Sequence, residues 1–210
     1  AAPGGGPPLA PQDAWTAGLG LLGRHNVANA LVARACLQAL GVPEADDDEA
    51  MAAAAAGFPG LESRLAPVGH VDGVDFVDDG LSTNVLPTLA AVDAFPGRRI
   101  ALLAGGFDRG VDYAPLARGL AARDVDTLVL CLPDSGPRIR AAIESAHPRA
   151  PRVEAVECAD LDEAVRRGAA WARPDGVVLL SPAAPSFGRF RDYRERSAAF
   201  ADAVRGLSRV

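Results

Sequence analysis

The chain has 210 residues, 49% of them hydrophobic, enough to bury the core of one α/β domain and a smaller piece. Its formal net charge of −6 disfavours nucleic acid and anionic membranes as partners, and no apolar run reaches the roughly 20 residues of a membrane span. All 21 basic residues are arginine. The absence of lysine excludes a Walker-type phosphate lysine and a Schiff-base lysine within this sequence.

The three cysteines, Cys36, Cys131 and Cys158, lie far apart and form no CxxC pair. We interpret them as buried thiols in a reducing cytoplasm, because a structural metal site needs closely spaced cysteines. The sequence therefore predicts a cytoplasmic protein with no metal ligands of its own in this part.

The N-terminal part is predicted to be a linker followed by two helices. Residues 1–13 are rich in proline and glycine, which is typical of a linker or disordered segment. Apolar spacing predicts helices over 26–40 and 46–56, the second capped by Asp46. Two helices alone make a poor core, so we expect residues 14–58 to be the end of something larger.

Between residues 59 and 210, short apolar runs alternate with helical patterns. Strands are predicted at 74–78, 99–104, 127–131, 153–156 and 177–181. Helices are predicted at 84–95, 114–123, 136–146, 161–173 and 189–206. Asp160 is the expected N-cap of the helix at 161, with Glu163 at the matching position. The alternation indicates an α/β fold with an open, mostly parallel Rossmann-like sheet flanked by helices.

A GxGxxG pattern at Gly18, Gly20 and Gly23 matches the dinucleotide fingerprint. That loop needs a preceding strand to bring its glycines to the pyrophosphate, and the preceding residues PQDAWTA form no strand. A dinucleotide-dependent oxidoreductase is therefore disfavoured.

The segment IALLAGGFDRG is the most informative part of the chain, because a buried strand ends there in Gly105 and Gly106. Neither glycine has a Cβ, so the backbone bends sharply and a ligand can approach closely. Arg109 follows at the carboxyl end of the strand, where open α/β sheets bind ligands. Its guanidinium matches a carboxylate bidentately. The alternative is a salt bridge to Asp108 or Asp112.

Two further strand ends carry polar residues. After the strand at 74–78, Asp79 could bind ribose hydroxyls or a metal, and Thr83 lies at a helix start that favours anions. Plain helix capping is the alternative for both. After the last strand, Ser186 is the N-cap of the final helix, a ligand for a substrate carboxylate, or both. Thr83, Arg109 and Ser186 thus come from three strand ends, and we expect them to share one cleft.

An asparagine pair marks the first long helix. Asn26 is a candidate N-cap, and Asn29 would then lie in the first turn. A side-chain amide there can offer a donor and an acceptor to a purine edge.

In this order, the segments resemble the C-terminal part of a Mur ligase, most closely a glutamate-adding member. GRHNVANALVA is similar to the family's G-x-H-N-x-x-N helix, and FPGLESR to its GLPHR hinge. FVDDGLSTN resembles its D-S-K-A-T-N segment. LLAGGFDRGVDYAPL and VLLSPAAPSFGRFRDYRERSAAF resemble its glycine-rich turn and its S-P-A-x-A-S-F segment. The resemblance runs from about residue 19 to 208.

The resemblance implies that residues 14–58 are a helical remnant of the central ATP-binding domain and residues 59–210 the amino-acid-binding domain. The whole enzyme would use ATP and Mg²⁺ to add glutamate to UDP-N-acetylmuramoyl-L-alanine through an acyl phosphate, as a monomer. By that resemblance the nucleotide-binding residues are Asn26, Asn29, Arg64 and Asp79. The glutamate-binding residues are Thr83, Arg109, Ser186 and Tyr193.

Two departures from the family pattern matter. Gly80 and Leu81 replace the family's serine and lysine, and a hydrophobic residue at 81 resembles a subclass suggested to add L-glutamate. The family's phosphate-binding G-K-[ST] loop, its metal-binding residues and its modified lysine are also missing here. We therefore expect no catalytic residue in this chain and no ligase activity from it alone. The alternative is a stand-alone, non-catalytic nucleotide- or amino-acid-binding domain.

Overall fold

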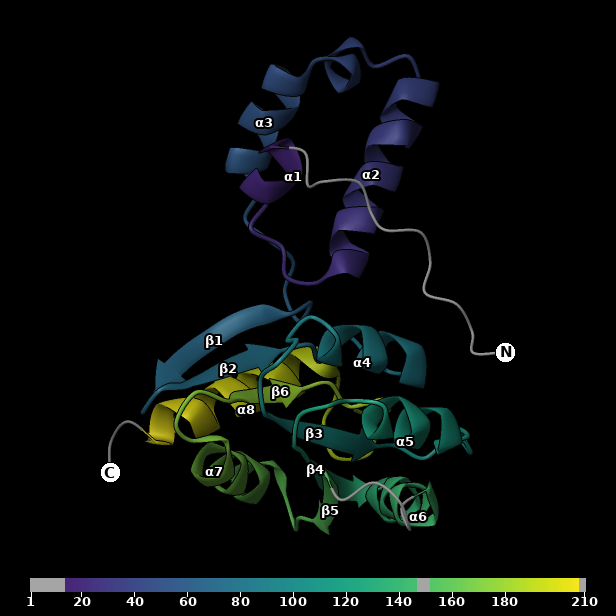
Figure 1. Ribbon diagram of the computed structural model, residues 1–210, viewed down its shortest axis with the longest axis vertical. Helices are drawn as coiled ribbons and strands as arrows, with labels where there is room; N and C mark the ends of the chain where they lie inside the picture. Colours follow the sequence, from purple (N-terminus) through teal and green to yellow (C-terminus); the bar gives the residue numbers. More distant parts are fainter. Residues whose placement is uncertain (1–13, 147–151, 208–210) are drawn as a thin grey trace. The chain divides into compact units, whose positions relative to one another are not determined.

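The computed structural model describes residues 14–146 and 152–207, so the linker predicted over residues 1–13 lies outside the described part. The chain divides into two compact units, Ala1–Gly60 and Leu61–Val210 (Figure 1). In neither unit is a described helix both long and apolar enough to cross a membrane.

The first unit is helical. It contains α1 (Ala14–Gly18), α2 (Arg24–Ala39), the 3-10 turn η1 (Pro43–Asp46) and α3 (Asp48–Ala56). The prediction that Asn26 caps α2 is wrong, because Gly23, with a φ of 86°, occupies the N-cap and starts the helix earlier. Asn26 instead lies in the first turn, where its amide nitrogen donates to the Leu22 carbonyl at 2.8 Å.

The cap of α3 is also shifted by one residue. Asp47, not Asp46, accepts hydrogen bonds from the amides of Glu49 at 2.9 Å and Ala50 at 3.3 Å. Asp46 is taken up by η1, which begins with Pro43 at its first position, a favoured place for proline.

The cysteine prediction holds for two of the three thiols. Cys131 and Cys158 are buried in the second unit, and burial raises the pKa of Cys131 to about 12. Cys36 is exposed on α2, which contradicts the expectation that all three are buried.

The second unit is built on a six-stranded sheet in the order β1-β2-β6-β3-β4-β5. The strands are β1 (Ala66–Val71), β2 (Val74–Asp78), β3 (Ile100–Gly106), β4 (Thr127–Asp134), β5 (Val153–Glu157) and β6 (Val177–Leu180). Only β1 runs antiparallel to its neighbour; the other pairs are parallel. The predicted fold class is confirmed.

Helices cover both faces of this sheet (Figure 1). They are α4 (Val85–Val92), α5 (Ala114–Ala121), α6 (Gly136–Ala146), α7 (Leu161–Ala172) and α8 (Tyr193–Leu207). From β2 the chain passes through α4, α5 and α6 to β3, β4 and β5 in turn, moving toward one edge of the sheet. From β5 it passes through α7 back to β6. With right-handed crossovers the two sets lie on opposite faces. Ala101 and Leu103 of β3 accordingly share a buried cluster with Ala164 of α7 and Phe200 of α8.

Two elements differ from the predictions. β1 is not among the predicted strands, because Pro67 and Gly69 interrupt its apolar pattern. Proline and glycine are tolerated there because β1 is an edge strand and has a bulge between these two residues. The final helix begins at Tyr193 rather than at residue 189, capped by Asp192, which accepts from the Glu195 amide at 2.9 Å. The predicted cap at Asp160 is confirmed by its 2.8 Å bond from the Glu163 amide.

Candidate functional site

Three loops meet at the carboxyl edge of the sheet, because β6 lies between β2 and β3. The amide of Gly105 donates to the Pro182 carbonyl at 2.8 Å, and the amide of Phe107 donates to Pro185 at 2.9 Å. The amide of Ala183 donates to the Ser82 carbonyl at 2.9 Å. The loop after β6 is therefore bonded to both of its neighbours, and the three form one continuous surface.

The glycine pair explains how closely these loops approach. Gly105 and Gly106 have φ values of 131° and 147°, which other residues rarely adopt. A Cβ on Gly106 would lie 2.3 Å from the Pro185 carbonyl oxygen, and one on Gly105 would lie 2.6 Å from that of Leu132. The sequence predicts that a ligand can approach this turn closely. In the structure, the backbone of neighbouring loops occupies the space beside the two glycines.

Arg109 and Thr83 lie together at this edge, as predicted. The Arg109 Nη2 donates to the Thr83 carbonyl oxygen at 2.9 Å. The alternative salt bridges are not formed: Asp108 pairs with Arg138 at 2.5 Å, and Asp112 accepts from the Ala114 amide. Within the described ranges no carboxylate pairs with Arg109, whose exposed guanidinium can still receive an anion.

Ser186 is buried and lines a cavity of about 210 Å³ together with Gly105 and Gly106. Its carbonyl accepts a bond from the Phe190 amide at 3.1 Å. The prediction that Ser186 caps the final helix is wrong, because α8 begins seven residues later under its own cap. Tyr193, the first residue of α8, is half-buried, and the guanidinium carbon of Arg194 lies 5.1 Å from its ring centroid.

Asp79 is held inside the edge rather than presented to a ligand. Its side chain is 3% exposed and accepts bonds from the Ser181 hydroxyl at 2.7 Å and the Leu65 amide at 3.3 Å. Burial raises the pKa of this carboxyl, and these hydrogen bonds only partly oppose the effect. Because so little of Asp79 is exposed, a ribose contact would require the packing around the carboxylate to open. The cap of α4 is Asn84, which accepts from the Val85 amide at 2.7 Å.

Arg196, which is not among the predicted site residues, is a fully buried arginine of α8 that lines the same cavity as Ser186. Its guanidinium donates to the carbonyls of Gly80 at 2.8 Å and Ala184 at 3.2 Å. Burial lowers its pKa to about 10. A signal was present, because Arg196 lies four residues before Phe200 on the buried face of the helix.

Residues 63–184 match the glutamate ligase domain of the Mur ligase family. The chain belongs to the Mur ligase family. This Mur ligase chain is 49% identical over 187 residues to the UDP-N-acetylmuramoyl-L-alanine--L-glutamate ligase of a Micromonospora species, covering 89% of the chain and 40% of that relative. It is 45% identical to the ligase of the same name from Salinispora tropica, covering 96% and 43%.

A relative named UDP-N-acetylmuramoylalanine--D-glutamate ligase, from Chromobacterium violaceum, is 40% identical and is covered over 38% of its length. The Mur ligase chain thus spans about 40% of the length of the curated relatives it matches.

Solved structures confirm the fold. The MurF ligase from Thermotoga maritima in complex with ADP aligns with a TM-score of 0.55 at 15% identity, covering 89% of this chain and 40% of that one. A pseudomurein peptide ligase type C from Methanothermus fervidus aligns with a TM-score of 0.57 at 13% identity, covering 88% and 36%.

The four residues expected at the nucleotide are divided between the two units of this Mur ligase chain. Asn26 and Asn29 lie on α2, and Asn29 is exposed; Arg64, also exposed, and Asp79 belong to the second unit. Among the described residues no group of three acidic, histidine or cysteine side chains is placed to hold a metal ion. The described residues do not fit a Mg²⁺ site, and we derive no step through that ion.

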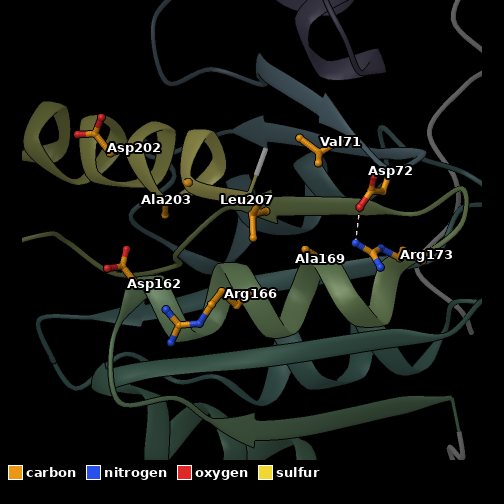
Figure 2. A pocket seen from close by; sticks show the side chains of 10 residues that line it. Val71, Asp72, Asp162, Arg166, Ala169, Arg173, Asp202, Ala203 and Leu207 are labelled. Carbon is orange, nitrogen blue, oxygen red and sulfur yellow. Dashed lines mark hydrogen bonds and ion pairs between the residues drawn. The ribbon is translucent and has the colours of Figure 1, made fainter. Parts of the chain in front are cut away.

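A larger hollow of about 630 Å³ lies between α7, α8 and the turn after β1 (Figure 2). Asp72 and Arg173 form an ion pair at its rim, while Ala169 and Leu207 supply apolar walls. None of the predicted site residues lines it. The larger hollow and the predicted glutamate-binding residues therefore lie in different parts of the second unit.

Proposed function

We propose that this chain is the glutamate-binding C-terminal portion of an ATP-dependent ligase that joins glutamate to UDP-N-acetylmuramoyl-L-alanine in peptidoglycan precursor synthesis. Membership of the Mur ligase family and the names of the relatives at 49% and 45% identity support this proposal. The observation that carries it is the hydrogen-bonded meeting of the three loops that contain Thr83, Arg109 and Ser186. Arg109 donates to the Thr83 carbonyl, while the cavity lined by Ser186 is lined by neither of them.

In this reaction the muramoyl-alanine carboxylate takes the γ-phosphoryl group of ATP, which forms an acyl phosphate and ADP. The phosphate of this intermediate is the leaving group of the next step. The glutamate amine then attacks the acyl carbon, loses a proton, and phosphate leaves. The residues of this chain bind and orient the dianion that carries the amine. The Arg109 guanidinium receives one carboxylate, and the hydroxyls of Thr83 and Ser186 donate to glutamate oxygens. These residues would accelerate amide formation by holding the glutamate amine in one orientation toward the acyl carbon.

We infer that the chain favours L-glutamate. The relatives at 49% and 45% identity carry the L-glutamate name, whereas the D-glutamate relative is 40% identical. The half-buried Leu81, in the loop between Asp79 and Thr83, takes the place of the family's lysine and removes one cation from this edge. Assaying the complete protein with each isomer tests the assignment; a higher kcat/KM with D-glutamate would contradict it.

We propose further that residues 14–58 belong to a larger ATP-binding domain. Val32 of α2 and Leu40, the residue that caps the end of α2, are 62% and 79% exposed. A self-contained helical unit would bury side chains of this size, and exposed apolar surface marks a contact with further protein. The monomeric state and a cytoplasmic location are part of the same proposal.

The glutamate clamp is tested by Arg109→Met in the protein encoded by the complete gene. Because the guanidinium binds a carboxylate in the ground state and the transition state alike, we expect KM for glutamate to rise about tenfold or more while kcat changes less. Arg118→Met, at an exposed arginine of α5, is the matched control. An unchanged KM for glutamate in Arg109→Met would show that the clamp is assigned wrongly.

A further inference from the structure

Arg196 is a charged side chain in a place where charge is costly. It lies on α8, is 1% exposed, and is the largest of the fully buried side chains of the described chain. Taking a guanidinium out of water is unfavourable unless its donors and its charge are satisfied. Its lowered pKa, which results from burial, reflects this cost. A buried arginine therefore needs a reason in the structure.

The contacts of Arg196 join all three loops of the site. Nη2 donates to the Gly80 carbonyl in the loop after β2, and Nη1 donates to the Ala184 carbonyl in the loop after β6. Nη1 also lies against the turn after β3, where a Cβ on Gly106 would come within 3.2 Å of it. One planar group thus fixes the spacing of loops that come from distant parts of the sequence.

The positive charge of Arg196 is not neutralised by an ion pair with any carboxylate of residues 14–146 or 152–207. Asp78 lowers the cost of the charge from a distance, but its oxygens accept bonds from the Gly80 amide at 2.8 Å and the Ser63 hydroxyl at 2.9 Å. The Nε of Arg196 is buried without a hydrogen-bond partner. Arg196 lines the same cavity as Ser186, together with Asp134 and Asp160. Asp134 is paired with Arg189 at 3.6 Å and Asp160 accepts from the Glu163 amide, so neither carboxylate pairs with Arg196.

We propose that Arg196 is a positioning residue of the glutamate site. It holds Thr83 and Ser186 at their working distance through the carbonyls of Gly80 and Ala184, and its charge favours an anionic ligand in the cavity. This inference rests on the proposed function. Arg196 acts through the loops, so its removal affects glutamate more than it affects ATP.

The test compares Arg196→Met and Arg196→Lys with wild type in the protein encoded by the complete gene. Methionine keeps the length but removes both donors and the charge, so we expect KM for glutamate to rise about tenfold or more and KM for ATP to change less than about twofold. Lysine keeps the charge but not the planar fork, and we expect it to restore part of the affinity. Arg205→Met, at an exposed arginine of the same helix, should leave both constants unchanged.

Circular dichroism melting of each variant separates positioning from simple stability. A folded Arg196→Met protein with wild-type KM for glutamate overturns the inference, and so does an equal rise in both KM values. If Arg196→Met does not fold, Arg196→Lys is combined with Ser186→Ala. Residues that act through one site give a combined effect smaller than the product of the single effects, and full multiplication overturns the inference. A wild-type protein without glutamate-dependent ADP formation would instead refute the proposed function.

Discussion

Asp79 and Arg109 both lie at the carboxyl edge of the sheet, but their surroundings differ. Asp79 is buried, and its oxygens accept hydrogen bonds from Ser181 and Leu65. Arg109 is exposed and bonded to the carbonyl of Thr83. The carboxylate therefore joins the loop before β1 to the end of β6, whereas the guanidinium keeps donors for a ligand. Two charged residues that look equivalent in the sequence thus differ: Asp79 is buried within the fold, whereas Arg109 is exposed.

Asp79→Asn should change how stability depends on pH. Burial raises the pKa of Asp79, so the folded chain binds this proton more tightly than the unfolded chain does. The stabilising free energy from this proton is then fully present below pH 3.8, the usual pKa of the carboxyl group. It is lost as the pH rises through the raised pKa of the folded chain. Asparagine does not titrate, so the variant does not lose this stabilisation. We therefore expect the free energy of unfolding of Asp79→Asn, relative to that of wild type, to increase as the pH rises above 3.8.

Urea unfolding at a series of pH values measures this difference. Asp124→Asn, at an exposed aspartate after α5, controls for the change in net charge. A difference for Asp79→Asn that stays constant between acidic and neutral pH would contradict the prediction.

At the scale of elements, the turn after β3 is the point where the three loops are held together. Gly106 has a left-handed φ and leaves room for the Pro185 carbonyl, which accepts the amide of Phe107. Arg196 of α8 lies near the same position, with its Nη1 3.2 Å from where a Cβ on Gly106 would be. Backbone hydrogen bonds therefore connect the loops directly, and the side chain of Arg196 adds further bonds to them.

Gly106→Ala should destabilise the chain by about 1–3 kcal/mol, since the new Cβ meets backbone 2.3 Å away at a strained φ. Gly206→Ala is the matched control, because nothing lies within 4 Å of its added methyl group and α8 continues through it. We expect the control to change stability by less than about 1 kcal/mol. Urea unfolding of both variants decides, and equal midpoints would show that the turn has room to relax.

At the scale of the whole molecule, the chain cannot supply a Walker-type phosphate lysine, because none of its residues is lysine. Phosphoryl transfer depends on positive charge arranged around the phosphates. The 210-residue chain by itself should therefore form no ADP from ATP when the muramoyl-alanine nucleotide and glutamate are supplied. A coupled ADP assay, with the protein encoded by the complete gene as positive control, measures this. Glutamate-dependent ADP formation by the chain alone would be the contrary result.

Much of the fold was predictable because its signals are local. The apolar runs of β2, β3, β4, β5 and β6 and the cap at Asp160 are encoded by neighbouring residues, and the structure confirms them. β1 escaped prediction because an edge strand needs no continuous apolar pattern. The start of α8 was misplaced because residues 182–192 are held by contacts with two other loops, which local sequence does not record.

The sequence by itself determined the parallel α/β sheet, the family and the residues that follow the strand ends. Period, turn chemistry and motif order suffice for these, since each depends on residues close together in the chain. Only the tertiary structure decided that Asp79 is buried, that Arg109 is exposed beside Thr83, and that Arg196 lies inside. The burial of a charge depends on which distant loops pack around it, and that packing exists only once the sheet has formed.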